Sequence, residues 1–279
     1  MIKRFKRENR GECEREWRAL TLLAAHAPGL APVPHSADLE AEHPVVVMSR
    51  LPGEPLRGKV LSDQQLRALV AAVSEMYAAV PADVLAEVPV RPGRQHQLIA
   101  QIRAWVPQVR SRVDGEVGVA MDRGLEWLAR SDMERVGRPD VPRVFGPGDG
   151  NLANYLWDGT RVRVVDFEDS GLSDRPFELA EITEHVAAWV GPPLAAETFL
   201  SLFDLNTAER ARLSECRKLL GSYGFSSCPS ETRSHPVTHR ERPSGKPPDC
   251  TTFLPEVIHR AGFRARTDHE LVAFITRER

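Results

Sequence analysis

The sequence has little cysteine, and no two of its cysteines lie close together. The 279 residues contain four, at Cys13, Cys216, Cys228 and Cys250. Small secreted domains carry dense cysteine frameworks, and zinc-binding domains carry closely spaced cysteine pairs. This spacing therefore indicates neither a disulfide framework nor a four-cysteine zinc site.

Long apolar runs and a large excess of one charge are also absent. No apolar run approaches the roughly 18 residues that predict a membrane-spanning helix, and no hydrophobic signal region follows the charged N-terminus. The 37 Lys and Arg residues nearly balance the 39 Asp and Glu residues, whereas a nucleic-acid-binding domain shows a basic excess. We therefore expect a cytoplasmic protein that binds neither nucleic acid nor membrane. The sequence does not predict its oligomeric state.

The chain is 42% hydrophobic and 27% charged, a composition that can bury one sizeable core or two lobes. Residues 1–6 have the pattern of a strand, and the β-branched run at 44–48 predicts a second, buried strand. Ser62 and Gln65 form a capping-box pattern that predicts a helix start. Apolar residues recurring at steps of three and four predict helices over 12–25, 62–77, 95–113, 117–129 and 176–190, and residues 193–220 are expected to form two more.

The most informative stretch of the sequence is 144–180. Val144-Phe145 leads into a Gly/Pro loop that delivers Asp149, and Asn154 follows five residues later. Asp158-Gly159 predicts a two-residue turn between short strands at 155–157 and 161–165. The second strand ends on Asp166. Three polar side chains are therefore expected near one edge of a small hairpin.

These residue types suit one particular chemistry. The oxygen donors of Asn154 and Asp166 fit Mg²⁺, which usually keeps waters and substrate phosphates as its other ligands. Asp149 is spaced to stay off the metal and face a hydroxyl group. Two other interpretations remain open: an ordinary loop, and a metal-dependent hydrolase cluster of Asp149, Asp166 and Asp169.

The order Asp, Asn and Asp around a hairpin is also used by protein kinases. In its details the stretch resembles the aminoglycoside phosphotransferase and choline kinase-like family of small-molecule kinases. The resemblance is carried by Pro147-Gly148-Asp149, by Asn154 and by Val165-Asp166-Phe167. The family usually has His where this chain has Pro147.

The resemblance implies an α+β, bilobal protein kinase-like fold. It implies a truncated small N-terminal β lobe with one helix at 1–52, and a larger, mostly helical C-terminal lobe at 53–220 that carries the catalytic hairpin. Such folds have a glycine-containing strand–turn–strand ahead of the lysine strand, and the sequence does not decide whether it lies upstream or is lost. An atypical tail, rich in Ser, Thr, Pro and Arg and poorly packed or partly disordered, is expected at 221–279.

The resemblance also implies roles for single residues. Lys3 matches the strand lysine that holds nucleotide phosphates, and Glu16 matches the helix glutamate that orients it, with Lys6, Arg7, Glu12 and Glu14 as nearby rivals. Met48, Ser49 and Leu51 match the interlobe hinge that binds adenine. Asp149 is the expected catalytic residue, and Asn154 and Asp166 are the expected Mg²⁺ ligands. Asp174 is expected to brace the catalytic loop through hydrogen bonds.

The implied function is transfer of the γ-phosphoryl group of ATP, or GTP, to a hydroxyl group of a small molecule. The alternative is a catalytically inactive kinase relic that binds a nucleotide or a metabolite. The sequence does not identify the acceptor, because related kinases act on chemically diverse small molecules and fold alone does not decide function.

Overall fold

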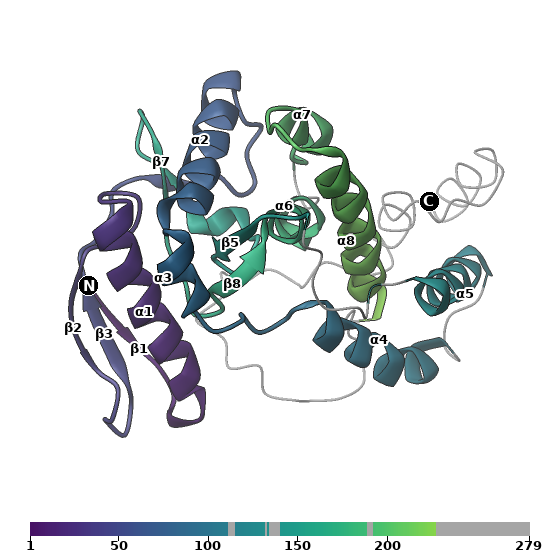
Figure 1. The fold of residues 1–279 in the computed structure, drawn as a ribbon, viewed down its shortest axis with the longest axis horizontal. Coiled ribbons are helices and arrows are strands. Elements are labelled where there is room, and N and C mark those ends of the chain that lie inside the picture. The colour runs from purple at the N-terminus through teal and green to yellow at the C-terminus, as the bar shows by residue number, and fades with distance from the viewer. Residues whose placement is uncertain (111–114, 132, 134–139, 189–191, 227–279) are drawn as a thin grey trace, which may run out of the picture. The chain divides into compact units, whose positions relative to one another are not determined.

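The computed structural model describes residues 1–110, 115–131, 133, 140–188 and 192–226 (Figure 1). The chain divides into two compact units: Met1–Gln97 with Val136–Arg217, and Leu98–Arg135 with the chain from Lys218 onward. This division does not test the lobe boundaries expected from the sequence, which stay predictions. Most of the expected atypical tail, with Cys228 and Cys250, lies outside the described residues.

The first unit begins with an antiparallel sheet in the order β1-β3-β2, formed by β1 (Ile2–Arg4), β2 (Pro34–Asp38) and β3 (Val45–Met48). Helix α1 (Arg10–His26) lies along this sheet (Figure 1). The strand expected at the N-terminus and the helix expected at 12–25 are confirmed. The strand β2 was not expected, because its sequence Pro-His-Ser-Ala-Asp has no apolar alternation.

The β3 strand is only half-buried, although its β-branched run predicted a fully buried strand. Val46 and Met48 are buried, whereas Val45 and Val47 are partly exposed. This alternation is typical of an antiparallel sheet covered on one face, here by α1. The sequence-based expectation was therefore wrong about burial and right about the strand.

Two further small sheets hold the hairpin region. One has the order β4-β6-β7, formed by β4 (Glu54–Pro55), β6 (Tyr155–Trp157) and β7 (Val162–Val164). The other pairs β5 (Arg143–Gly146) with β8 (Gly171–Asp174), antiparallel. The β6–β7 connection is a four-residue loop and not the expected two-residue turn. Asp158 closes this loop by accepting hydrogen bonds from the backbone N–H groups of Thr160 and Arg161, both at 2.9 Å.

The remaining helices of this unit follow the expected order. They are α2 (Asp63–Ala79), α3 (Ala82–Ala86), α6 (Arg175–Glu184), α7 (Ala196–Ser201) and most of α8 (Thr207–Ser226). Short 3-10 turns lie at Arg7–Asn9, Leu152–Asn154 and Val186–Ala188. Helix α6 ends earlier than the expected residue 190, because His185 leaves the helical conformation with ψ 137°. The short α3 was not expected.

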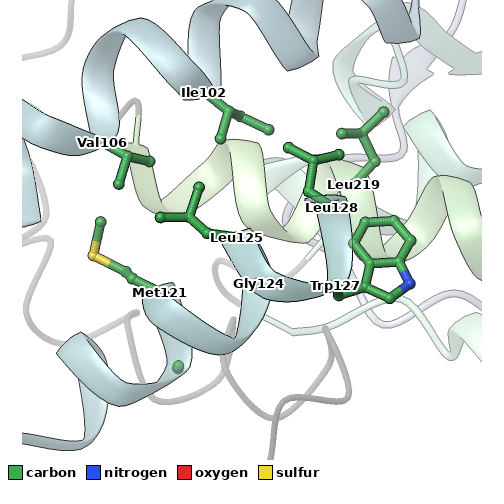
Figure 2. Close-up of a pocket in the computed structure, with 9 residues that line it drawn as sticks. Ile102, Val106, Met121, Gly124, Leu125, Trp127, Leu128 and Leu219 are labelled. Carbon is green, nitrogen blue, oxygen red and sulfur yellow. The ribbon is translucent and has the colours of Figure 1, made fainter. Parts of the chain in front are cut away.

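The second unit contains α5 (Gly115–Arg130) and most of α4 (Gln95–Arg110). Arg110 forms a two-pronged ion pair with Asp122, with N–O distances of 2.8 and 2.9 Å. Apolar side chains of both helices and of α8 line a shallow pocket that is open to solvent. Figure 2 labels Ile102, Val106, Met121, Gly124, Leu125, Trp127, Leu128 and Leu219 around it. Ile102, Val106, Met121 and Leu128 are buried, which confirms the apolar faces expected for these helices. No helix in the described residues is long and apolar enough to cross a membrane.

The capping box at the start of α2 generates a stability prediction. The Ser62 hydroxyl accepts the backbone N–H of Gln65, and the Gln65 side chain accepts the backbone N–H of Ser62. We expect Ser62→Ala to lower the free energy of unfolding by about 1 kcal/mol, as measured by chemical denaturation. The control is Ser74→Ala on the exposed face of the same helix, which should not destabilise. Equal losses in the two variants would contradict this role for the cap.

Candidate active site

The loop that carries Asp149, residues 146–151, is held tightly between two neighbouring segments. Gly148 has φ +85°, and a Cβ atom there would lie 2.0 Å from the carbonyl oxygen of Asp169. A Cβ atom on Gly150 would lie 2.1 Å from the carbonyl oxygen of Glu181 in α6. No side chain larger than that of glycine fits at either position. The backbone on both sides of Asp149 is therefore fixed by contact.

The Asp149 carboxylate is oriented by its own neighbours and is still reachable from solvent. Its Oδ1 accepts the backbone N–H of Asn151 at 2.9 Å, and its Oδ2 accepts Nδ2 of Asn154 at 2.9 Å. The Nε2 atom of His185 lies 3.5 Å from Oδ1. The Asp149 side chain is 34% exposed, whereas Asn154 is buried. This arrangement suits a base or an orienting group for an incoming polar ligand.

Asp166 has a strained backbone at the end of the hairpin. Among the described residues it is the only non-glycine residue with a positive φ, +72°. Such strain is uncommon outside functional sites and needs support from the surrounding structure. The residue before Asp166 is held by a hydrogen bond: the backbone N–H of Val165 donates to the carbonyl oxygen of Asn154 at 3.0 Å. The structure thus brings Asn154 and Asp166 to the same edge of the hairpin.

Lys3 connects the N-terminal sheet to this edge. Its ammonium lies 2.9 Å from Glu16 Oε2 and 3.0 Å from Glu168 Oε2, and it donates a hydrogen bond to Asp166 Oδ1. Glu16 is buried, and its Oε2 also accepts the backbone N–H of Phe167 at 2.7 Å. Burial alone would lower the pKa of Lys3, but the three carboxylates outweigh it and raise that pKa. Lys3 is therefore charged at neutral pH.

Two of the nearby residues that could have formed this ion pair in place of Lys3 or Glu16 contact other groups. Lys6 lies 3.9 Å from Glu8, and Glu12 accepts a hydrogen bond from Asn9 at 2.7 Å. Burial raises the pKa of Glu16, and the Lys3 ammonium opposes that shift. The structure therefore pairs Lys3 with Glu16, as the resemblance implied.

The hinge residues offer few backbone groups to a ligand. Met48 is buried, its N–H donates to the Met1 carbonyl oxygen and its carbonyl accepts from the Met1 amino group. The N–H of Ser49 donates to the carbonyl oxygen of Val33 at 2.8 Å. Within the described part of the chain, the Ser49 carbonyl oxygen and the Leu51 N–H make no hydrogen bond. These two groups are among the backbone groups of this segment that could bind a ligand.

A buried ionic network also fixes the Asp149 loop, and sequence reasoning missed it. The Arg91 guanidinium pairs with Glu178 at 2.6 Å and with Glu181 at 2.7 Å. Both polar groups of Gly148 join the network: its carbonyl accepts from Arg91 at 3.2 Å, and its N–H donates to Glu178 at 3.3 Å. The available signal was Glu178 itself, an acid between the core residues Phe177 and Leu179, because a fully buried carboxylate needs a partner.

Asp174 does not brace this loop, so that expectation was wrong. Its carboxylate caps α6 by accepting the backbone N–H of Phe177 at 2.9 Å, and it pairs with Arg94 at 2.8 Å and Arg212 at 3.2 Å. The residue before a helix is well placed for capping. The bracing role falls to Arg91 and Glu178.

The described residues contain no group of three or more His, Cys, Asp or Glu side chains placed to hold a metal ion. The hydrolase cluster of Asp149, Asp166 and Asp169 is therefore not supported. Asp169 instead lies 3.8 Å from Arg15. A metal here would depend on Asp166, on the amide oxygen of Asn154 and on oxygens from the ligand, as Mg²⁺ commonly does.

The Arg91 network generates a prediction that separates buried charge from packing. We expect Arg91→Met to lower the free energy of unfolding by about 3–5 kcal/mol, because the Glu178 carboxylate stays buried without its partner. The double variant Arg91→Met, Glu178→Gln removes that charge and should recover part of the loss. Chemical denaturation measures both. If the double variant is less stable than the single one, the uncompensated charge is not the cause.

Comparison with known proteins relates this geometry to a family. The model of the phosphotransferase enzyme family matches residues 1–216. The search of curated proteins finds no significant match. Among solved structures, the complex of spectinomycin phosphotransferase APH(9)-Ia with ADP and spectinomycin has a TM-score of 0.61 at 11% identity. That match covers 94% of this chain and 84% of the other.

Two further structures show the same fold. An aminoglycoside phosphotransferase of the APH(2") group, solved with GDP and kanamycin, has a TM-score of 0.55 at 17% identity, over 76% of this chain and 74% of its own. A thermostable mutant of APH(4)-Ia has a TM-score of 0.52 at 18% identity, over 77% of both chains. The expected α+β, protein kinase-like fold is confirmed. The chain belongs to the phosphotransferase enzyme family.

Proposed function

We propose that this protein transfers the γ-phosphoryl group of ATP, or GTP, to a hydroxyl group of a small molecule. The observation that carries the proposal is the contact of Lys3 with both Glu16 and Asp166. It joins a lysine–glutamate pair suited to nucleotide phosphates to the hairpin edge that holds Asn154 and Asp149. The site therefore has a place for the nucleotide and a carboxylate for the acceptor.

Each residue has a role that its contacts support. Asp149 orients the acceptor hydroxyl and takes its proton, as a fixed and accessible carboxylate can. Lys3 holds nucleotide phosphates, and buried Glu16 keeps the lysine in place. The Ser49 carbonyl and the Leu51 N–H bind the base, and Met48 belongs to the same segment. Such a reaction depends on positioning and electrostatics, so it needs no covalent enzyme intermediate.

The residues present fit a magnesium ion. The Nδ2 group of Asn154 is committed to Asp149, so its amide oxygen is the end left for a cation. The Asp166 carboxylate pairs with the Lys3 ammonium, and this contact supports a role for Asp166 in binding a cation. Asn154 and Asp166 would hold Mg²⁺. When bound, the ion would offset phosphate charge during transfer.

The structural relatives suggest which ligands to try first. Their complexes contain ADP, AMP or GDP, and gentamicin, kanamycin or spectinomycin. We propose a nucleotide and a small hydroxyl-bearing acceptor of this kind as partners, and a cytoplasmic location. The inactive relic is the competing function, and the second experiment below separates it from the enzyme.

The nucleotide site is tested by calorimetric titration with ATP, and in parallel with GTP, with and without magnesium. We expect binding to require magnesium and to be lost in Asp166→Ala, because that variant removes a metal ligand and a partner of Lys3. Asp140→Ala, at an exposed position, is the matched control and should bind as the unchanged protein does. Magnesium-dependent binding that survives Asp166→Ala would contradict the role of Asp166.

The transfer step is tested by a coupled assay that measures release of the nucleoside diphosphate, ADP or GDP. Gentamicin, kanamycin, spectinomycin and choline are each supplied as a candidate acceptor. Asp149→Asn should lower kcat by roughly 10²–10⁴-fold, as expected for losing a general base. Asp83→Asn, an exposed aspartate on α3, should leave kcat unchanged. An Asp149→Asn protein with undiminished turnover would refute its role. Tight magnesium-dependent binding without turnover on any acceptor would favour the relic.

A further inference from the structure

His185 is fixed just beyond the C-terminal end of α6, where it reaches the Asp149 loop. Its backbone N–H donates to the carbonyl oxygen of Glu181 at 3.0 Å, and its own carbonyl accepts the N–H of Ala188 at 2.8 Å. The side chain is 25% exposed. Because both backbone groups are bonded, the ring can change position only by rotating about its side-chain bonds.

The ring is also held in one tautomer. Its Nδ1 accepts the backbone N–H of Ala187 at 3.0 Å, so that nitrogen carries no proton. The proton of the neutral ring is then on Nε2, the nitrogen 3.5 Å from Asp149 Oδ1. Burial lowers the pKa of His185, and nearby Arg57 acts in the same direction, while Asp149 opposes them. The Nε2–H group of the neutral ring therefore lies near Asp149 Oδ1, at an N–O distance longer than an ordinary hydrogen bond.

A count of lone pairs shows what this donor does to the carboxylate. An ionised carboxylate has about four acceptor positions, two on each oxygen. On Asp149, Oδ1 faces the N–H of Asn151 and Nε2 of His185, and Oδ2 accepts Nδ2 of Asn154. One position remains, and it is on Oδ2, the oxygen beside the proposed metal ligand Asn154.

We propose that His185 is a positioning residue that occupies Oδ1 of Asp149 and directs the acceptor hydroxyl to Oδ2. The inference rests on the proposed function of Asp149. Resemblance to the family would not suggest it, because the family histidine stands at the position of Pro147 and this histidine comes from the end of α6. No sequence pattern indicates a role for His185, which is 36 residues beyond Asp149.

The role has a consequence for pH dependence. Protonation of His185 places a proton on Nδ1, which breaks the hydrogen bond from Ala187 and puts a cation beside Asp149. A ring that has lost this hydrogen bond no longer holds its position beside Oδ1, so turnover should fall on the acid side as His185 becomes charged. Asp149 and Arg57 are the charged groups that act on this ring.

The geometry is tested by nitrogen-15 NMR of the histidines in the full chain, without nucleotide or acceptor. We expect the Nε2–H tautomer for His185 and a pKa below the ordinary value. In Asp149→Asn that pKa should fall further, because the carboxylate that favours the charged ring is gone. The Nδ1–H tautomer, or the same pKa in both proteins, would overturn the proposal. This measurement does not depend on activity.

The positioning role is tested by the slow hydrolysis of ATP with magnesium, measured from pH 5.5 to 8. We expect His185→Leu to lower kcat roughly tenfold, the value of one hydrogen bond, because the 3.5 Å contact is expected to tighten to a hydrogen bond when the ligands bind; KM for ATP should be unchanged. His185→Gln keeps a side-chain donor and cannot titrate near neutral pH. Its kcat should lie within about threefold of that of the unchanged protein. The fall in kcat toward pH 5.5, which the unchanged protein should show, is expected to be absent in this variant.

The control is His26→Gln at the exposed end of α1, which should change neither kcat nor the pH profile. Thermal unfolding checks that each variant is folded; if His185→Leu is not, the pH profile of His185→Gln decides. Undiminished kcat in His185→Leu, or an acid limb that persists in His185→Gln, would overturn the positioning role. The expected NMR result without any hydrolysis would instead count against the proposed function, and the contact would stand.

Discussion

The site depends on one partly buried cation, the Lys3 ammonium, with three carboxylates around it. A charged group taken out of water is costly unless it is paired, and here the pairing comes from the α1 helix, from the end of β7 and from the residues after it. Because Glu16 also accepts the N–H of Phe167, the same contact fixes the chain next to strained Asp166. The N-terminal sheet and the hairpin are thus joined by charge.

The Asp149 loop is held by a second buried network that contains no proposed reacting group. Arg91 and Glu178 bond both polar groups of Gly148, and glycine is required there because Asp169 approaches so closely. Phosphoryl transfer depends on positioning, so a loop fixed in this way suits the role proposed for Asp149. In this protein the loop is supported by α6 and by the segment around Arg91.

Because of His185, the two carboxylate oxygens of Asp149 have different surroundings. One oxygen faces the ring of His185 and the N–H of Asn151, and the other meets Asn154 and has room for one more donor. An acceptor that approached Oδ2 would be close to the groups proposed to hold magnesium. The end of α6 therefore constrains the direction of approach in a site whose other members lie on the N-terminal sheet, on α1, on the Asp149 loop and on the hairpin.

The sequence by itself determined the local elements and the residues with chemical potential. Helical periodicity, the Ser62 capping box and the spacing of Asp149, Asn154 and Asp166 are local patterns, and the Lys3–Glu16 pairing followed from the resemblance. Only the tertiary structure decided that Arg91 and Glu178 brace the loop, that Asp174 pairs with Arg94 and Arg212, and that His185 reaches Asp149. These contacts join residues up to 87 positions apart, and β2 and β8 form only because partner strands complete them. No pattern of neighbouring residues encodes such pairings, because burial and charge compensation are decided where distant segments meet.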